Sequence, residues 1–159
     1  LYIMSMPPKD MDLGDEAFMP NPIVVIAPTS DPLAKRSAVP LHELAQRRFI
    51  LREKGSGTRM AMAEHFQAQG FEPLVRLELG SNEAIKQAVA GGMGISVLSR
   101  HALAAVPASE GLAVLHVAGF PIHAHWYMVQ PRGKRLSPIA QVFQQHLLAQ
   151  AHHTHIDET

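Results

Sequence analysis

The sequence lacks several features that would each define a class of protein. Its 159 residues contain no cysteine, which excludes disulfide bonds, thiolate catalysis and cysteine-ligated metal sites. No apolar run approaches the roughly 20 residues that a membrane-spanning helix needs, so we expect no membrane association. Acidic and basic residues balance to a formal net charge of zero, with no basic stripe. These residues by themselves therefore do not predict a nucleic-acid-binding surface.

Catalytic and metal-binding motifs are also missing. The glycines at 91–94 end a predicted helix and enter a strand, whereas the dinucleotide fingerprint leaves a strand and opens a helix. His42-Glu43 lacks the second histidine of a zinc-protease helix, and His123 and His125 have no third ligand nearby in the sequence. We therefore predict no enzymatic activity, no metal site and no cofactor.

The chain begins with a strand-like run, residues 1–4, that has no initiator methionine. No signal peptide is visible. We expect the chain to be a fragment of a longer polypeptide.

A glycine-rich loop follows one of the predicted buried strands. Residues 48–51 predict the strand, and Ser56, Gly57 and Thr58 lead directly into a helical pattern. Ser56 or Thr58 can cap this helix. A helix N-terminus presents unpaired N–H groups and a partial positive charge, which suits an anion. Arg59 would lie in the first turn, where the helix dipole disfavours a cation. A residue that goes against such a local preference often marks a functional site. The alternative is an ordinary strand–turn–helix connection with an exposed arginine.

A second small-residue loop repeats this arrangement. Residues 74–79 alternate as a strand, and Ser81 or Asn82 can cap the helix that follows. Ser99 ends a third predicted strand and can cap a short helix over 100–106. Residues 48–106 therefore read as strand–helix repeated three times. This pattern predicts parallel strands with right-handed crossovers, whose ligands bind outside the carboxyl ends of the strands. We therefore expect the two loops and Ser99 to face one crevice.

The flanking segments predict further elements. We expect a polar loop over 7–17, a turn at Asn21-Pro22, a buried strand over 23–27, and further strands over 112–117 and 125–130.

A C-terminal helix is predicted from Ser137 and Pro138. Its inward face is expected to consist of Ile139, Val142, Phe143 and Leu147. The polar, histidine-containing segment 151–159 is expected to be a frayed tail.

Two long stretches carry a family resemblance. FILREKGSGTR at 49–59 and LELGSNEAIKQAVAGGMGISVLS at 77–99 resemble the effector-binding domain of LysR-type transcriptional regulators. Residues 119–122, Trp126-Tyr127 and 133–138 fit the same family. The resemblance is greatest to the CbbR branch, which regulates the RuBisCO operon of the Calvin cycle.

The resemblance implies an α/β fold of two Rossmann-like lobes joined by crossover strands, similar to periplasmic binding proteins and truncated at the N-terminus. Lobe I, incomplete, would comprise 1–41 and 119–150, and lobe II would comprise 42–118. The effector would lie between the lobes, contacted by Ser56, Gly57 and Thr58 from lobe II and by Ser5 from lobe I. The contributions of Arg59, Ser81, Asn82 and Ser99 are inferred from strand-end geometry alone.

The implied function is that of the sensing domain of a cytoplasmic transcription factor that regulates CO2-fixation genes. A small anionic metabolite, namely a phosphorylated Calvin-cycle intermediate or NADPH, would be the effector. DNA would be bound only through an N-terminal helix-turn-helix domain that this chain lacks, and the domain would form homodimers or homotetramers. Two alternatives remain open: a periplasmic solute-binding protein, and an enzyme acting on a phosphorylated substrate.

Overall fold

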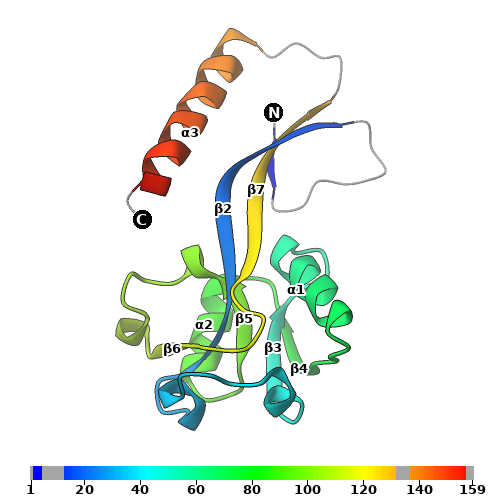
Figure 1. The fold of residues 1–159 in the computed structure, drawn as a ribbon, viewed down its shortest axis with the longest axis vertical. Helices are drawn as coiled ribbons and strands as arrows, with labels where there is room; N and C mark the ends of the chain where they lie inside the picture. Colours follow the sequence, from blue (N-terminus) through cyan, green and yellow to red (C-terminus); the bar gives the residue numbers. More distant parts are fainter. Residues whose placement is uncertain (1, 5–12, 132–136, 157–159) are drawn as a thin grey trace. The chain divides into compact units, whose positions relative to one another are not determined.

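The computed structural model describes residues 2–4, 13–131 and 137–156. Its elements follow one another in this order (Figure 1): β1 (Tyr2–Met4), β2 (Leu13–Pro28), the 3-10 helices η1 (Pro32–Lys35) and η2 (Leu41–Leu44), β3 (Arg48–Arg52), α1 (Gly57–Ala68), β4 (Leu74–Leu79), α2 (Asn82–Ala90), β5 (Ser96–Ser99), η3 (Arg100–Ala102), η4 (Pro107–Glu110), β6 (Leu112–Leu115), β7 (Ile122–Pro131) and α3 (Pro138–Ile156). None of the helices described is long and apolar enough to cross a membrane.

The chain forms two compact units. Unit 1 comprises Leu1–Asn21 and His125–Thr159, and unit 2 comprises Pro22–Ala124. The long strands β2 and β7 each contribute residues to both units. The sequence-based division placed residues 22–41 in lobe I, whereas the structure groups them with unit 2.

Strands with both faces buried form the centre of unit 2. Side chains alternate along a strand, so Ile23, Val25 and Ala27 of β2 pack in one hydrophobic cluster, while Val24 and Ile26 pack in another. The first cluster contains Met62 and Phe66 of α1, and the second contains Ile85 and Val89 of α2. Helices therefore cover both faces, as the strand–helix repeat predicted.

Parallel pairing is confirmed for part of the predicted region. β3 and β4 pair in parallel, and a single parallel bridge joins Phe49 to Ile95 just before β5. β5 itself pairs antiparallel with β2, from Ile23 opposite Ser99 to Ile26 opposite Ser96.

Two local predictions near the N-terminus are wrong. Asn21-Pro22 is not a turn, since β2 is continuous from Leu13 to Pro28. Its pairing with β5 begins at Ile23, after Pro22, so the missing N–H of the proline costs that ladder no hydrogen bond. For the same reason residues 13–17, predicted as part of a polar loop, are strand.

The C-terminal predictions also need correction. α3 continues to Ile156, so residues 151–156 are helical and not a frayed tail. No glycine or proline occurs between Ile139 and Ile156 to end the helix. Ile139, Val142 and Phe143, predicted to face inward, are exposed.

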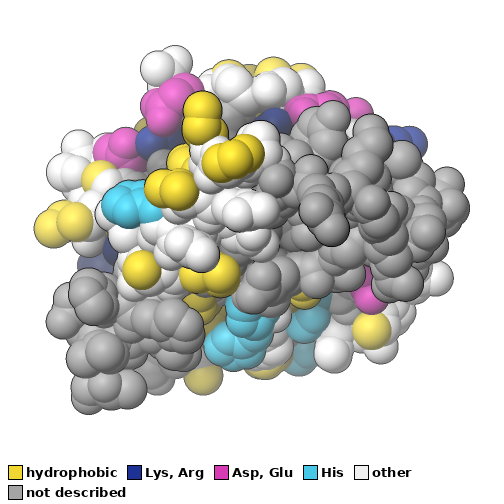
Figure 2. All heavy atoms as spheres, turned by 90° about the horizontal axis from the view of Figure 1, so that it is seen from above, with side chains coloured by type: hydrophobic (Ala, Val, Ile, Leu, Met, Phe, Trp, Pro, Cys, Tyr) yellow, Lys and Arg dark blue, Asp and Glu magenta, His cyan; other side chains and the backbone are white. Residues whose placement is uncertain are grey.

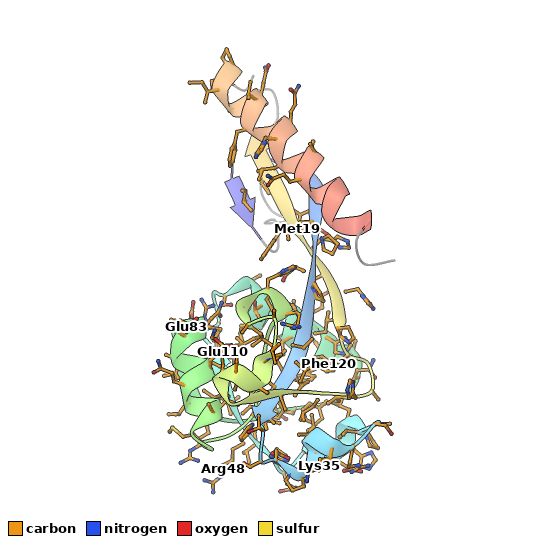
Figure 3. All side chains as sticks on the ribbon, turned by 90° about the vertical axis from the view of Figure 1, so that its left-hand side faces the viewer. Met19, Lys35, Arg48, Glu83, Glu110 and Phe120 are labelled. Atoms are coloured by element: carbon orange, nitrogen blue, oxygen red, sulfur yellow. The ribbon has the colours of Figure 1, made fainter. Side chains whose placement is uncertain are left out.

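A buried lysine joins α2 to η4. The Lys86 ammonium lies 2.9 Å from a Glu83 carboxylate oxygen and 2.8 Å from one of Glu110, both labelled in Figure 3. The other Glu110 oxygen accepts the Ala104 N–H at 3.0 Å. The hydrogen bonds that Lys86 donates to both carboxylates raise the pKa of Lys86, and the bond to Glu110 lowers the pKa of Glu110. The pair therefore holds the loop after β5 against α2.

We predict that Gly94→Ala destabilises the fold through a backbone contact. A Cβ at position 94 would lie well inside van der Waals contact of the Arg48 carbonyl oxygen, which accepts the Ile95 N–H at 2.9 Å. Neither backbone segment can move without breaking the parallel bridge between Phe49 and Ile95. We expect the free energy of unfolding to fall by about 1–3 kcal/mol in urea denaturation. Gly80→Ala, which meets nothing within 4 Å, is the control and should stay within about 0.5 kcal/mol of wild type.

We also predict a pH-dependent effect of Asp31→Asn. Burial alone would raise the pKa of Asp31, but hydrogen bonds from Arg47 and from the Leu33 N–H outweigh it, so that the pKa lies below its ordinary 3.8. The carboxylate therefore stabilises the fold above that value, and this contribution is lost as the pH falls through the lowered pKa. At pH 7 the substitution should lower Tm by roughly 2–6 °C. A Tm difference that persists undiminished at pH 3 would contradict this assignment.

Candidate functional site

Two polar loops lie together where β3 and β4 end. In the parallel ladder Arg52, the last residue of β3, is level with Leu79, the last residue of β4. α1 begins at Gly57 and α2 at Asn82, each a few residues beyond its strand. The structure thus brings the predicted 55–58 and 80–83 loops to the same edge, with two helix N-termini.

The two predicted caps are present. Ser56 Oγ accepts the Arg59 N–H at 3.3 Å, and Ser81 Oγ accepts the Ala84 N–H at 3.1 Å. Ser56 is buried, while Gly57 and Thr58 remain partly exposed in the first turn of α1. Each cap satisfies one N–H group, so the other first-turn N–H groups of each helix have no intrahelical partner.

Arg59 has structural partners that its sequence position did not reveal. Its Nη1 donates to the Arg52 carbonyl oxygen at 2.8 Å and lies 3.2 Å from a Glu78 carboxylate oxygen. The side chain is only 12% exposed. Glu78 thus offsets the cation that the helix dipole disfavours, and Arg59 fastens α1 to the end of β3.

Arg52 is the residue that the sequence-based prediction missed. Its Nη1 donates to Asn82 Oδ1 at 2.7 Å, while Nε and Nη2 donate to Glu53 at 3.1 and 3.0 Å. The bond from Arg52 lowers the pKa of Glu53. The guanidinium therefore connects the end of β3 to the first residue of α2. An arginine directly after a buried strand and before a glycine loop was the available signal.

The remaining predicted residues are placed as follows. Ser99 ends β5, is buried, and accepts the His101 N–H at 3.2 Å, which caps η3 as predicted. Ser5 lies outside the residues that the structure describes. Within the described part of the chain, no group of three or more His, Asp or Glu side chains could hold a metal ion.

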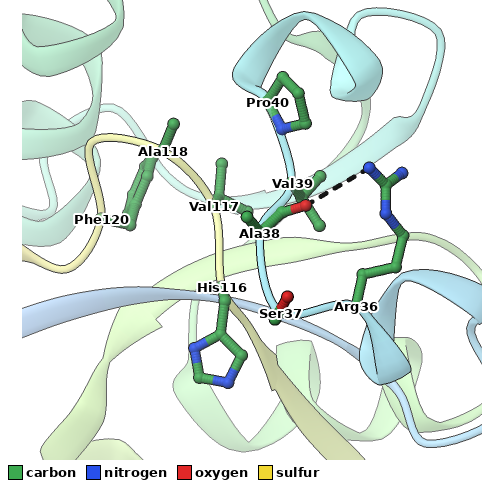
Figure 4. Close-up of a pocket in the computed structure, with 9 residues that line it drawn as sticks. All are labelled: Arg36, Ser37, Ala38, Val39, Pro40, His116, Val117, Ala118 and Phe120. Atoms are coloured by element: carbon green, nitrogen blue, oxygen red, sulfur yellow. Dashed lines mark hydrogen bonds between the residues drawn. The ribbon is translucent and has the colours of Figure 1, made fainter.

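A separate groove in unit 2 has a volume of about 470 Å³ (Figure 4). It is lined by residues 36–40 and 116–118 together with Phe120, and the Val39 N–H donates to the His116 carbonyl at 2.8 Å. Arg36 is bound to the Glu43 carboxylate and donates to the Ala38 carbonyl at 3.3 Å. Glu43 already neutralises this cation, and no α-helix begins among the lining residues. The groove therefore lacks the helix N-termini that favour an anion at the strand ends.

These features define a ligand-binding domain of the periplasmic-binding-protein type. They are a sheet with helices on both faces, polar loops at its strand ends, and two long strands shared with a second unit. The family model of the LysR substrate binding domain matches residues 1–152. The chain belongs to this family, so it is the effector-binding region of a LysR-type protein. The sequence-based fold class and family assignment are confirmed.

Curated relatives are transcriptional regulators. The chain is 46% identical over 149 residues to the HTH-type transcriptional activator CmpR of Synechocystis sp., covering 94% of this chain and 49% of CmpR. It is 47% identical over 149 residues to the RuBisCO operon transcriptional regulator of Acidithiobacillus ferrooxidans, covering 94% of this chain and 48% of that protein. The chain thus spans about half the length of the curated relatives it matches.

Solved structures agree with this assignment. The regulatory domain of Synechocystis PCC6803 CcmR, solved in complex with 2-PG, matches with a TM-score of 0.88 and 50% identity, covering 94% of this chain and 72% of that one. The effector binding domain of QuiR in complex with shikimate matches with a TM-score of 0.82 at 20% identity, covering 94% and 70%, and shows the shared fold alone.

We predict that Arg52 and Asn82 are energetically coupled. Arg52→Met and Asn82→Ala should each destabilise the chain, and the double variant should lose less than the sum, with a coupling energy of about 0.5–2 kcal/mol in urea denaturation. The matched control replaces Arg36, which pairs with Glu43 instead, by methionine. Arg36→Met combined with Asn82→Ala should be additive within about 0.5 kcal/mol. If the effects of Arg52→Met and Asn82→Ala on the free energy of unfolding were additive, the contact between the two side chains would not stabilise the site.

Proposed function

We propose that this chain senses a small anionic metabolite for a cytoplasmic transcription factor that regulates CO2-fixation genes. The similarity to RuBisCO operon regulators over nearly the whole chain carries the proposal. DNA would be bound through a helix-turn-helix domain outside these residues, and the domain would act as a homodimer or homotetramer without catalysing a reaction. A periplasmic solute-binding role is not favoured, because the curated relatives are transcriptional regulators.

The strand-end site is suited to an anion. The two helix N-termini present N–H groups and partial positive charge, and an anion there gains typically 0.3–1 kcal/mol from each dipole at an exposed site. A capping serine accepts an N–H with its oxygen while its hydroxyl hydrogen can still be donated. Ser56 and Ser81 can therefore each cap a helix and donate a hydrogen bond to an anion at the same time. The backbone N–H of Gly57 can donate to the same anion.

Side chains around this edge would complete the recognition of the effector. Thr58 offers a hydroxyl from the first turn of α1, and Asn82 offers an amide N–H2 group, because its oxygen is held by Arg52. Arg59 contributes by fixing α1. We assign Ser99 and Ser5 supporting roles from the end of β5 and from the segment after β1. The effector proposed is a phosphorylated Calvin-cycle intermediate or NADPH. 2-PG, the ligand in the CcmR structure, is a further anionic compound to test.

The proposal is tested by thermal-shift titration with 2-PG, ribulose bisphosphate, phosphoenolpyruvate, NADPH and sulfate. A ligand at 100 times its Kd should raise Tm by about 5–10 °C, since it adds about 2.7 kcal/mol. Thr58→Val should abolish the shift. Thr29→Val, which removes the same hydroxyl from an exposed position at the end of β2, should leave it unchanged. Equal shifts with sulfate and with every metabolite would contradict specific sensing.

A further inference from the structure

A second groove in unit 2 lies along β6. Its volume is about 460 Å³, and it is lined by Thr29, Arg100 and residues 106–108 and 112–114. Val106 is 65% exposed, so the groove presents apolar surface to water. Arg100 is the one charged side chain among these described residues, and none of them belongs to the strand-end site. We call this feature the β6 groove.

One edge of β6 is free to pair with a further strand. In its antiparallel ladder with β2, opposite residues alternate between pairs that exchange hydrogen bonds and pairs that do not. The Thr29 N–H donates to the Gly111 carbonyl at 3.2 Å, so the hydrogen-bonded pairs involve the odd-numbered residues of this segment. The N–H and C=O groups of Leu112 and Val114 therefore point away from β2.

The segment after β6 shows the same orientation. On the outer edge the His116 carbonyl accepts the Val39 N–H at 2.8 Å, and the Ala118 N–H donates to the Val39 carbonyl at 2.9 Å. Outside the ladder with β2, no backbone hydrogen bond joins Leu112 or Val114 to another described residue. β6 contains no charged residue or proline, which are features that protect open strand edges in natural proteins.

Arg100 gives the β6 groove a cation that no described carboxylate neutralises. Figure 2 shows basic side chains beside acidic ones on the face drawn there, and Arg36 and Arg47 illustrate such pairing. Arg100 takes part in none of the ion pairs between described residues. Its Nη1 and Nη2 instead donate to the Ala104 and Ala105 carbonyls at 3.0 and 3.1 Å. A guanidinium has five N–H donors, so this one is held in place with donors to spare.

We propose that the β6 groove is a docking site for an extended peptide segment of a partner protein, which pairs with the free edge of β6 and places an acidic side chain against Arg100. The backbone of the segment bonds to Leu112 and Val114, as when a peptide adds a strand to a sheet edge. An apolar side chain of the segment covers Val106. A carboxylate matches the planar guanidinium, which can donate two parallel hydrogen bonds to it.

Two other occupants fit the β6 groove less well. A second copy of β6 brings no acidic side chain, because residues 111–116 contain none. A nucleic acid binds through several phosphates that need several cations, whereas Arg100 is alone among the described lining residues. An acidic peptide uses the strand edge, the apolar surface and the single cation together.

The proposal is tested with a capped peptide of alternating valine and glutamate, titrated into the isotope-labelled chain while backbone amide signals are followed by NMR. The signals of residues 112–114 should shift and saturate. A peptide with glutamine in place of glutamate should bind roughly 10-fold more weakly, because charge-assisted hydrogen bonds are the stronger ones.

Strand pairing is tested without altering the protein. Two glutamate peptides are N-methylated on alternate amides, one set in each. Only alternate N–H groups of an added strand face β6, so one peptide should bind roughly 10-fold more weakly and the other should keep its Kd.

The role of Arg100 is tested by Arg100→Met. This variant should bind the glutamate peptide no more tightly than the glutamine peptide. Arg36→Met is the matched control, since it removes an arginine from the groove in Figure 4, and it should keep the preference for glutamate.

The proposal is overturned if the signals of residues 112–114 do not saturate, if both N-methylated peptides bind equally, or if Arg100→Met still prefers glutamate. Shifts of the same signals that grow with the concentration of the chain alone would also overturn it, because a second copy would then occupy the edge. None of these readouts involves an effector, so failure here is independent of the proposed function.

Discussion

The burial of β2 and β3 on both faces is the constraint on which unit 2 depends. Successive residues of β2 and of β3 enter different hydrophobic clusters, so each face needs its own helix. A chain that covers both faces of parallel strands has to return over the sheet after each strand. The crossovers then bring the loops after β3 and β4 to the same edge. The position of the candidate site is thus a consequence of how the core is buried.

Electrostatics at that edge is arranged around Arg52. Its carbonyl oxygen accepts from Arg59 and its guanidinium contacts Asn82 and Glu53, so one residue connects α1, α2 and β3. Glu78 compensates Arg59, and Glu53 compensates Arg52. An anion at the helix N-termini would therefore meet cations that are already held in place. Fixed dipoles and charges of this kind bind without paying for reorganisation.

Local patterns predicted the parts of the fold that depend on local physics. Ser56, Ser81 and Ser99 cap their helices as expected, because a cap involves residues only two or three apart. The contact between Arg52 and Asn82 joins residues 30 apart and depends on the pairing register of β3 with β4, which no local signal specifies. The turn prediction at Asn21-Pro22 failed for a related reason: β2 continues through a segment whose local preference is a turn.

The prediction for α3 differs from these failures. Its apolar spacing predicts a buried face, and the helix forms as predicted, yet Ile139, Val142 and Phe143 are exposed. Apolar spacing predicts that a helix forms and which residues share a face, but it does not specify which neighbour that face packs against. Among the described residues, both clusters of buried hydrophobic side chains belong to unit 2, so the candidate site at the ends of β3 and β4 lies next to a well-packed core.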